Sequence, residues 1–309
     1  PGHSGSPQNG TTVSRFKGSM TVVYYPDAAI ADPTPRKLAA AIRPLTETLV
    51  ASTPLIFTGL AVAISFRTSV FNIGVEGQFV LGALGATIAA LILRDLAPAP
   101  VILVVALVAG MATGGLWGFV PGFLKARTGA HEVITTIMLN YVAAQVVLFA
   151  LRSDFLRQEG SGQPISKVIK EFAQIPLLVP LPGMRLHLGF IVALIVAAIV
   201  SWFLFRTTKG FELRAAGFSL TAARYAGMSA GGSIILAMSI AGAVAGLGGA
   251  FQVLGTVGQM SNDVSSGFGW DAIALALLGG IRPGGVVAAA LAMALANSPA
   301  SARRSAARF

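Results

Sequence analysis

Residues 101 to 120 read VILVVALVAGMATGGLWGFV, a run without a single charged side chain. A helix of about 20 such residues crosses the ~30 Å hydrocarbon core of a lipid bilayer. Similar runs occur at about 48–66, 79–93, 133–151, 188–205 and 233–255, and two shorter ones follow at 270–281 and 284–297. The pattern predicts an all-α fold, a polytopic transmembrane helical bundle with about eight spans.

Composition favours a membrane environment. The 309-residue chain is 54% hydrophobic and 11% charged, with a mean hydropathy of +0.75, and is therefore far more apolar than a soluble domain. Its net charge of +10 does not indicate nucleic-acid binding, because the basic residues lie in short loops beside apolar runs. The absence of cysteine excludes disulfides, zinc–thiolate sites and iron–sulfur clusters. Since His131 also lacks a partner at ligand spacing, we expect no metal and no cofactor.

The basic residues orient the spans. Lys125 and Arg127 precede the fourth span, and Arg206 and Arg224 follow the fifth. Loops rich in Lys and Arg stay in the cytoplasm, so both loops are expected there. The intervening residues 152–187 then form an external loop.

The chain divides into three expected parts. A polar N-terminal segment, 1–41, precedes a transmembrane domain at 42–297, and a basic tail follows at 298–309. Within the domain, two Gly-rich breaks at 67–78 and 256–269 are expected on opposite faces of the membrane, which predicts an inverted repeat. Interrupted apolar segments at matching positions of two repeats point to a binding site, because unwound backbone is tolerated in a membrane only where it lines a cavity.

The first break carries polar side chains. The segment FNIGVEGQ, 71–78, places Asn72, Glu76 and Gln78 between two apolar runs. Polar groups at membrane depth are costly unless paired, so they are functional candidates. The alternative is a plain solvated turn.

A second polar set opens the fourth span. In HEVITTIMLNY, 131–141, the residues Glu132, Thr136 and Asn140 recur every four positions and share one helix face. The alternative is a helix start whose Asn bonds a neighbouring helix. We predict a substrate path lined or supported by Phe71, Asn72, Glu76, Gln78 and Asn140. Phe71 is the candidate for stacking on a ring of the substrate, because an aromatic face stacks on a flat ring.

Between the fifth and sixth spans lies an Ala-rich, polar-flanked insert, the cytoplasmic loop 206–230. Its composition favours a short surface helix that presents small residues to a partner's groove. It resembles the coupling loop of the permeases of ABC importers, which docks onto an ATP-hydrolysing subunit. The resemblance implies that the coupling residues are Glu212, Leu213, Arg214, Ala215, Ala216, Gly217, Ala222, Ala223 and Gly227.

The resemblance extends along the chain, from about Ile42 to Ala296. The segments that carry it, in order, are FNIGVEGQ (71–78), HEVITTIMLNY (131–141), RLHLGF (185–190), GFELRAAG (210–217), ARYAGM (223–228) and GFGWDAIALALLGG (267–280). They resemble the nucleoside and simple-sugar branch of the ribose and branched-chain amino-acid permease family. Complete members have more spans, so we expect this chain to lack a first span and the last one or two.

The family resemblance implies a nucleoside importer that works by alternating access in the inner (plasma) membrane of a prokaryote. Its expected partners are ABC ATPase subunits, a second permease subunit that is identical or a paralogue, an extracytoplasmic substrate-binding lipoprotein and the lipid bilayer, with no nucleic acid. The alternatives are a monosaccharide or branched-chain amino-acid permease, or an ion-coupled secondary transporter.

Two enzyme patterns fail. Residues 227–231 fit the G-x-S-x-G pattern of a hydrolase, but they follow an expected helix rather than a strand, and no histidine after His187 completes a triad. No Gly-Lys dipeptide occurs, so a phosphate-binding loop is missing. We therefore expect no enzyme activity and ATP hydrolysis by a partner chain.

Overall fold

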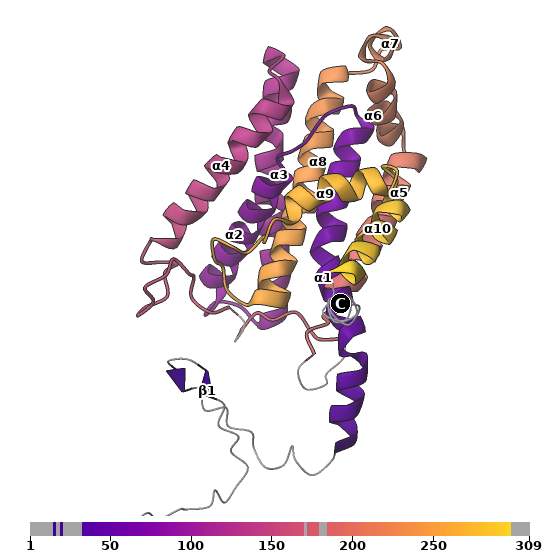
Figure 1. The fold of residues 1–309 in the computed structure, drawn as a ribbon. Coiled ribbons are helices and arrows are strands. Elements are labelled where there is room, and N and C mark those ends of the chain that lie inside the picture. The colour runs from indigo at the N-terminus through magenta and orange to yellow at the C-terminus, as the bar shows by residue number, and fades with distance from the viewer. Residues whose placement is uncertain (1–14, 17–18, 21–32, 170–171, 179–183, 298–309) are drawn as a thin grey trace, which may run out of the picture.

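The computed structural model describes residues 15–16, 19–20, 33–169, 172–178 and 184–297, which form a helical bundle (Figure 1). A pair of two-residue antiparallel strands, β1 (Arg15–Phe16) and β2 (Ser19–Met20), precedes it. The helices are α1 (Pro33–Arg67), α2 (Val75–Leu93), α3 (Ala99–Thr128), α4 (Glu132–Leu151), α5 (Gly189–Arg206), α6 (Thr208–Phe218), α7 (Leu220–Tyr225), α8 (Ala230–Phe251), the π-helix η2 (Gln252–Val257), α9 (Phe268–Leu278) and α10 (Pro283–Ala296).

Six of these helices are long and apolar enough to cross a membrane, which confirms the predicted polytopic bundle. The six stretches are Ile42–Arg67, Val75–Leu93, Ala99–Thr128, Glu132–Leu151, Gly189–Arg206 and Ala230–Val257. The two shorter apolar helices, α9 and α10, correspond to the two shorter predicted segments.

The first helix is longer than predicted. It begins at Pro33, so the segment expected to be polar up to residue 41 is in part helical, and it continues through Pro44 and Pro54. Proline removes a backbone donor, but membrane helices tolerate it where neighbouring groups satisfy the freed backbone. Separately, the Thr48 hydroxyl donates to the carbonyl of Pro44 itself at 2.8 Å, and the Thr58 hydroxyl donates to that of Pro54 at 2.9 Å. These bonds anchor the two threonines on the proline turns and do not replace the missing proline donors. The predicted basic tail, 298–309, lies outside the described residues.

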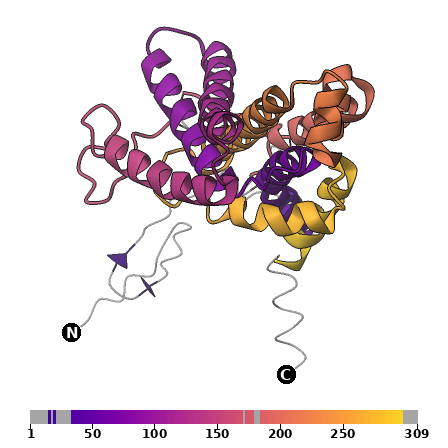
Figure 2. The ribbon, with the colours of Figure 1, turned by 90° about the horizontal axis from the view of Figure 1, so that it is seen from above.

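Glycines bring α2, α3 and α8 into backbone contact. A Cβ on Gly114 would lie 2.4 Å from the carbonyl oxygen of Gly242, and one on Gly82 would lie 2.1 Å from the Cα of Gly246. Small residues at four-residue spacing allow such close approach in membrane helices. Seen from above, α8 lies among α1, α2 and α3 at the centre of the bundle (Figure 2).

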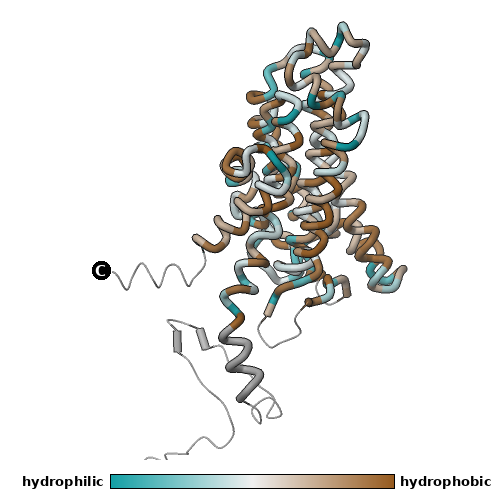
Figure 3. Tube along the Cα trace, turned by 90° about the vertical axis from the view of Figure 1, so that its right-hand side faces the viewer, coloured by the Kyte–Doolittle hydropathy of each residue, from teal (hydrophilic) through white to brown (hydrophobic). Residues whose placement is uncertain are grey.

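Helices α3, α4 and α5 expose most of their surface at the periphery of the bundle, whereas α1 is largely buried. In α1, 83% of the most apolar window is buried, whereas the value is 22% for both α3 and α4 and 28% for α5. Hydrophobic residues run along the sides of the bundle in Figure 3. Helices α6 and α7 lie at one end of the bundle, and the described residues between α4 and α5, 152–169, 172–178 and 184–188, lie at the other (Figure 1).

Candidate functional site

The first break is shorter than predicted. It occupies residues 68–74, because α2 begins at Val75 and takes Glu76 and Gln78 into its first turns. The expected break of 67–78 treated these polar residues as non-helical. The structure instead satisfies their side chains within the bundle, so the helix can include them.

A reciprocal amide pair holds the break. The fully buried Asn72 donates from Nδ2 to Gln78 Oε1 at 3.2 Å, and Gln78 donates from Nε2 to Asn72 Oδ1 at 3.3 Å. The same Asn72 oxygen accepts from the backbone N–H of Gly74 at 3.0 Å. Buried polar groups cost free energy unless they are hydrogen-bonded, and here each amide satisfies the other.

Asn140 ties the break to α4. Its Oδ1 accepts from the Gly77 backbone N–H at 2.9 Å, and its Nδ2 donates to the Ile73 carbonyl at 2.9 Å. Thr136, one turn earlier, is buried against Gly74, as the shared helix face predicts. Glu132, at the start of α4, forms an ion pair with Lys125 instead of entering the core.

Glu76 links the two breaks. Its Oε2 accepts from the Gly269 backbone N–H at 2.8 Å, in the first turn of α9. A Cβ on Gly269 would lie 2.4 Å from the Glu76 Cα, so the first turns of α2 and α9 are in contact. A carboxylate at a helix N-terminus is favourable because it satisfies a free N–H and faces the positive end of the helix dipole.

Phe71 differs from the other four predicted path residues. Its side chain is 48% exposed, and its ring centroid lies 4.5 Å from that of Phe66. Internal hydrogen bonds use the polar atoms of Asn72, Gln78 and Asn140. These side chains therefore support the break and do not line an open surface.

The insert between α5 and α8 forms two short helices. The Thr207 hydroxyl caps α6 by accepting from Gly210 N–H, and the Ser219 hydroxyl caps α7 by accepting from Ala222 N–H. Such side-chain caps satisfy free donors at helix starts.

The nine predicted coupling residues fall into three groups. Leu213, Ala216 and Ala223 are buried against the bundle; Glu212, Arg214, Ala215 and Gly217 are half-buried; Ala222 and Gly227 are exposed.

Large aromatic side chains, which sequence reasoning missed, are the most exposed part of this insert. Phe218 is 91% exposed and Tyr225 is 89% exposed, and Phe211 follows at 54%. The sequence did offer a signal for them, because bulky aromatic residues stand out in an Ala-rich segment. Beside them, a cleft of about 760 Å³ is lined by the α5–α6 connection and residues 226–229. Exposed aromatic residues beside a cleft are typical anchors of protein interfaces.

The insert rests directly on the first break. The Ser69 hydroxyl donates to the Gly217 carbonyl, and a Cβ on Gly217 would lie 2.2 Å from the Arg67 carbonyl oxygen. Arg67 in turn donates from Nε to the Ile281 carbonyl, at 2.8 Å, in the α9–α10 turn. Ser69 and Ile281 both have positive φ angles, 53° and 55°, which non-glycine residues adopt rarely. The α6 helix therefore contacts the end of α1 and, through Arg67, the α9–α10 turn.

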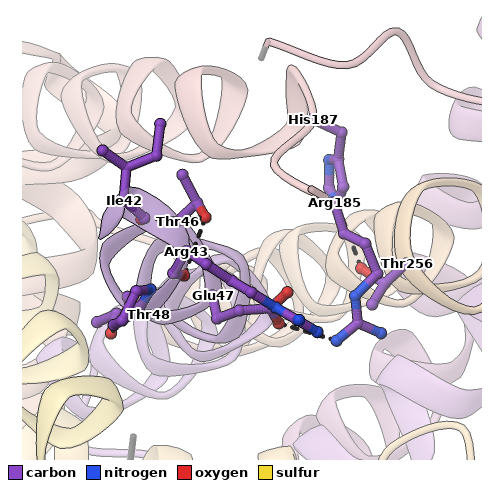
Figure 4. A network of polar contacts seen from close by, with 9 residues as sticks. Ile42, Arg43, Thr46, Glu47, Thr48, Arg185, His187 and Thr256 are labelled. Carbon is purple, nitrogen blue, oxygen red and sulfur yellow. Dashed lines mark hydrogen bonds and ion pairs between the residues drawn. The ribbon is translucent and has the colours of Figure 1, made fainter. Parts of the chain in front are cut away.

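A buried histidine, His187, lies in the segment before α5, near Arg185 and Thr256 (Figure 4). His187 contacts the Thr256 hydroxyl at 3.2 Å and accepts at Nδ1 from the Gly189 N–H at 3.0 Å. Burial lowers the pKa of His187 to about 4. Close by, Arg185 forms an ion pair with Glu47 of α1, with 2.8 Å between Nη2 and Oε2. These contacts attach the segment before α5 to η2 and α1.

Comparison with known proteins shows that the chain is similar to permease components of transport systems. A family model described as "Branched-chain amino acid transport system / permease component" matches residues 45–303. The guanosine ABC transporter permease protein NupP of Bacillus subtilis is 46% identical over 79% of this chain and 70% of its own length. The nucleoside ABC transporter permease protein NupB of Lactococcus lactis is 37% identical over 81% and 70%. The glucose ABC transporter permease protein TsgB13 of Haloferax volcanii is 36% identical over 76% and 63%. No solved structure matches the chain.

Proposed function

This chain belongs to the family of branched-chain amino acid transport system permease components, and we propose that it is the membrane-spanning permease subunit of an ATP-driven nucleoside importer. It is a multi-pass membrane protein, with six helices long enough to cross a bilayer. The observation that carries the substrate class is the 46% identity to a guanosine permease over 79% of the chain. The expected location is the inner membrane of a prokaryote.

In the proposed mechanism the permease itself catalyses no chemical reaction. ATP is hydrolysed by partner ATPase subunits, and an extracytoplasmic binding protein delivers the substrate to a pair of permeases. The ATPase binds α6 and α7 through the exposed rings of Phe218 and Tyr225. Two observations support this role: the exposure of the aromatic rings and the adjoining cleft of about 760 Å³.

Movement of α6 would reach the substrate path through two hydrogen bonds. The Ser69 to Gly217 bond leads to the first break, and the Arg67 to Ile281 bond leads to the α9–α10 turn. The spanning helix α2 and the shorter helix α9 meet through Glu76 and Gly269, so a shift at either end changes their relative position. Alternating access requires two arrangements of such packed elements.

The path residues take different roles in this proposal. Phe71 offers an exposed ring for stacking on a nucleobase. Asn72, Gln78 and Asn140 fix the backbone that presents it. Glu76 controls the contact between α2 and α9.

The test is uptake by the complete transporter, with its ATPase, binding protein and second permease. Cells expressing it should accumulate radiolabelled guanosine, lose uptake on ATP depletion and retain it when an uncoupler collapses the ion gradient. Uptake that survives ATP depletion but not the uncoupler would mean an ion-coupled transporter instead.

A monosaccharide importer is the second candidate, because a glucose ABC transporter permease is 36% identical over 76% of this chain. The same assay with labelled glucose separates the two. Glucose uptake without guanosine uptake would replace the proposed substrate class, while ATP dependence would still support the permease assignment.

A further inference from the structure

A small cavity lies where α6 meets the end of α1 and the α9–α10 turn. Its volume is about 220 Å³, and its lining includes Arg67, Arg214 and Ile281. It shares Arg214 with the larger cleft beside α6 and is also lined by Phe218, and none of the predicted path residues lines it.

Three positive charges gather around this cavity. Arg282 follows the lining residue Ile281, and the charges of Arg282 and Arg214 both act on Arg67. In the described part of the chain, none of the three forms an ion pair with a carboxylate; the four ion pairs there involve other residues. Three unpaired guanidinium groups repel one another, so an anion between them would be stabilised.

The guanidinium groups are held in place but incompletely bonded. Arg67 and Arg214 lie over the same ring, that of Phe205, at 5.5 Å and 5.2 Å from its centroid. Arg67 uses Nε for the Ile281 carbonyl. The Nε of Arg214 is buried and has no hydrogen-bond partner among the described residues. A buried donor without a partner costs free energy, which a bound acceptor would recover.

The cavity lies at the level where apolar segments end. Arg67 is the last residue of one candidate span, and Arg206, the neighbour of Phe205, is the last residue of another. Arg282 immediately precedes the apolar helix α10. Basic pockets between helices at a membrane surface suit phospholipid headgroups, and the arginine fork matches phosphate oxygens in a bidentate way.

We propose that this cavity, the arginine pocket of Arg67, Arg214 and Arg282, binds the phosphate of an anionic phospholipid headgroup. The shared chemistry is a phosphate held by guanidinium groups. Since the pocket joins α6, α1 and the α9–α10 turn, the headgroup would brace the elements through which α6 acts on the breaks. The proposal concerns a lipid site and does not depend on which solute is transported.

The test uses the full chain in phosphatidylcholine nanodiscs with and without phosphatidylglycerol. Native mass spectrometry after gentle detergent release counts the phosphatidylglycerol that stays bound. Arg214→Gln and Arg282→Gln should each weaken retention about tenfold, the effect of losing one charge-assisted hydrogen bond to phosphate. The Arg282 side chain is exposed and forms no hydrogen bond or ion pair with the described residues, so its variant should keep the fold.

A matched control is Arg127→Gln. Arg127 is also an exposed arginine, with its guanidinium 5.8 Å from the ring centroid of Phe123, but it lies outside the pocket. Its variant should retain phosphatidylglycerol like the wild type, and a loss equal to that of the pocket variants would overturn the proposal.

Inorganic phosphate separates the two sources of the ligand. If it displaces phosphatidylglycerol from the wild type, the pocket recognises phosphate itself and a free phosphate can also fill it. Equal retention by wild type and pocket variants would overturn the proposal. Pocket variants that keep the lipid but fail to bind the ATPase would also overturn the proposal, since the arginines would then serve in protein docking.

Discussion

The first break and the α6–α7 insert differ in how their polar and aromatic groups are satisfied. In the break, Asn72, Gln78 and Asn140 are buried and hydrogen-bonded to one another or to backbone. In the insert, Phe218 and Tyr225 are almost fully exposed. The comparison teaches that the hydrogen bonds around the break are satisfied within the chain, whereas the insert leaves large aromatic rings uncovered by the described residues.

The largest expected effect is on the break. Asn140→Ala leaves the Gly77 N–H and the Ile73 carbonyl buried without partners, which should lower the free energy of unfolding by about 2–4 kcal/mol. Thermal unfolding in detergent micelles measures the change. Gln145→Ala, at an exposed position of the same helix, is the control and should change little. Equal stabilities would show that the break is held by other contacts.

The insert should respond in the opposite way. Phe218→Ala combined with Tyr225→Ala should leave thermal stability near that of the wild type but weaken ATPase binding by about 2 kcal/mol or more, because exposed aromatic residues are typical interface hot spots. Binding to the purified ATPase measures the loss. Phe149→Ala removes an 81% exposed ring from α4 and serves as the control. Undiminished ATPase binding would remove these rings from the docking surface.

A pH titration extends the comparison to the buried group at the other end of the bundle. The pKa of His187 is lowered from 6.5 to about 4 in the folded protein, so the unfolded chain binds the proton first as pH falls. The contribution of His187 is therefore complete above about pH 6.5, and stability should drop by about 1 kcal/mol between pH 6.5 and 5.5. Melting curves of wild type and His187→Gln at both pH values measure it. The variant should lose less stability than the wild type over this interval, and parallel curves would contradict the assignment.

The smallest effect is expected where the two regions meet. Ser69→Ala removes the hydroxyl that donates to the Gly217 carbonyl, a contact worth about 1 kcal/mol, so uptake should fall roughly fivefold. ATPase binding should stay unchanged, since this variant keeps both exposed rings, Phe218 and Tyr225. Ser69→Thr keeps a hydroxyl and should restore part of the uptake. If ATPase binding fell in parallel with uptake, the bond would belong to docking instead of transmission.

Hydropathy was sufficient to predict the long helices, because a long apolar run in a bilayer can satisfy its backbone hydrogen bonds within itself only as a helix. Local chemistry misjudged two boundaries. Glu76 and Gln78 look non-helical until their partners are known, and the polar character of the residues before Ile42 hid the start of α1 at Pro33.

The candidate site was predicted in part. The polar residues of the break were identifiable because charges and amides are rare in apolar runs. Their roles depend on contacts between distant positions, such as Glu76 with Gly269, 193 residues apart, and Ser69 with Gly217, 148 residues apart. No local pattern encodes such pairs. The exposure of Phe218 and Tyr225 likewise follows from which face of the insert is buried.

The glycine contacts among α2, α3 and α8 limit how this protein can change shape. Carbonyl oxygens and Cα atoms of facing helices already touch where a Cβ would stand, as between Gly110 and Gly246. Sliding one helix past another would force side chains into backbone, because close-packed interiors resist such shear. These three helices would travel together as a single rigid block, and the adjustable joints are the breaks and turns around it.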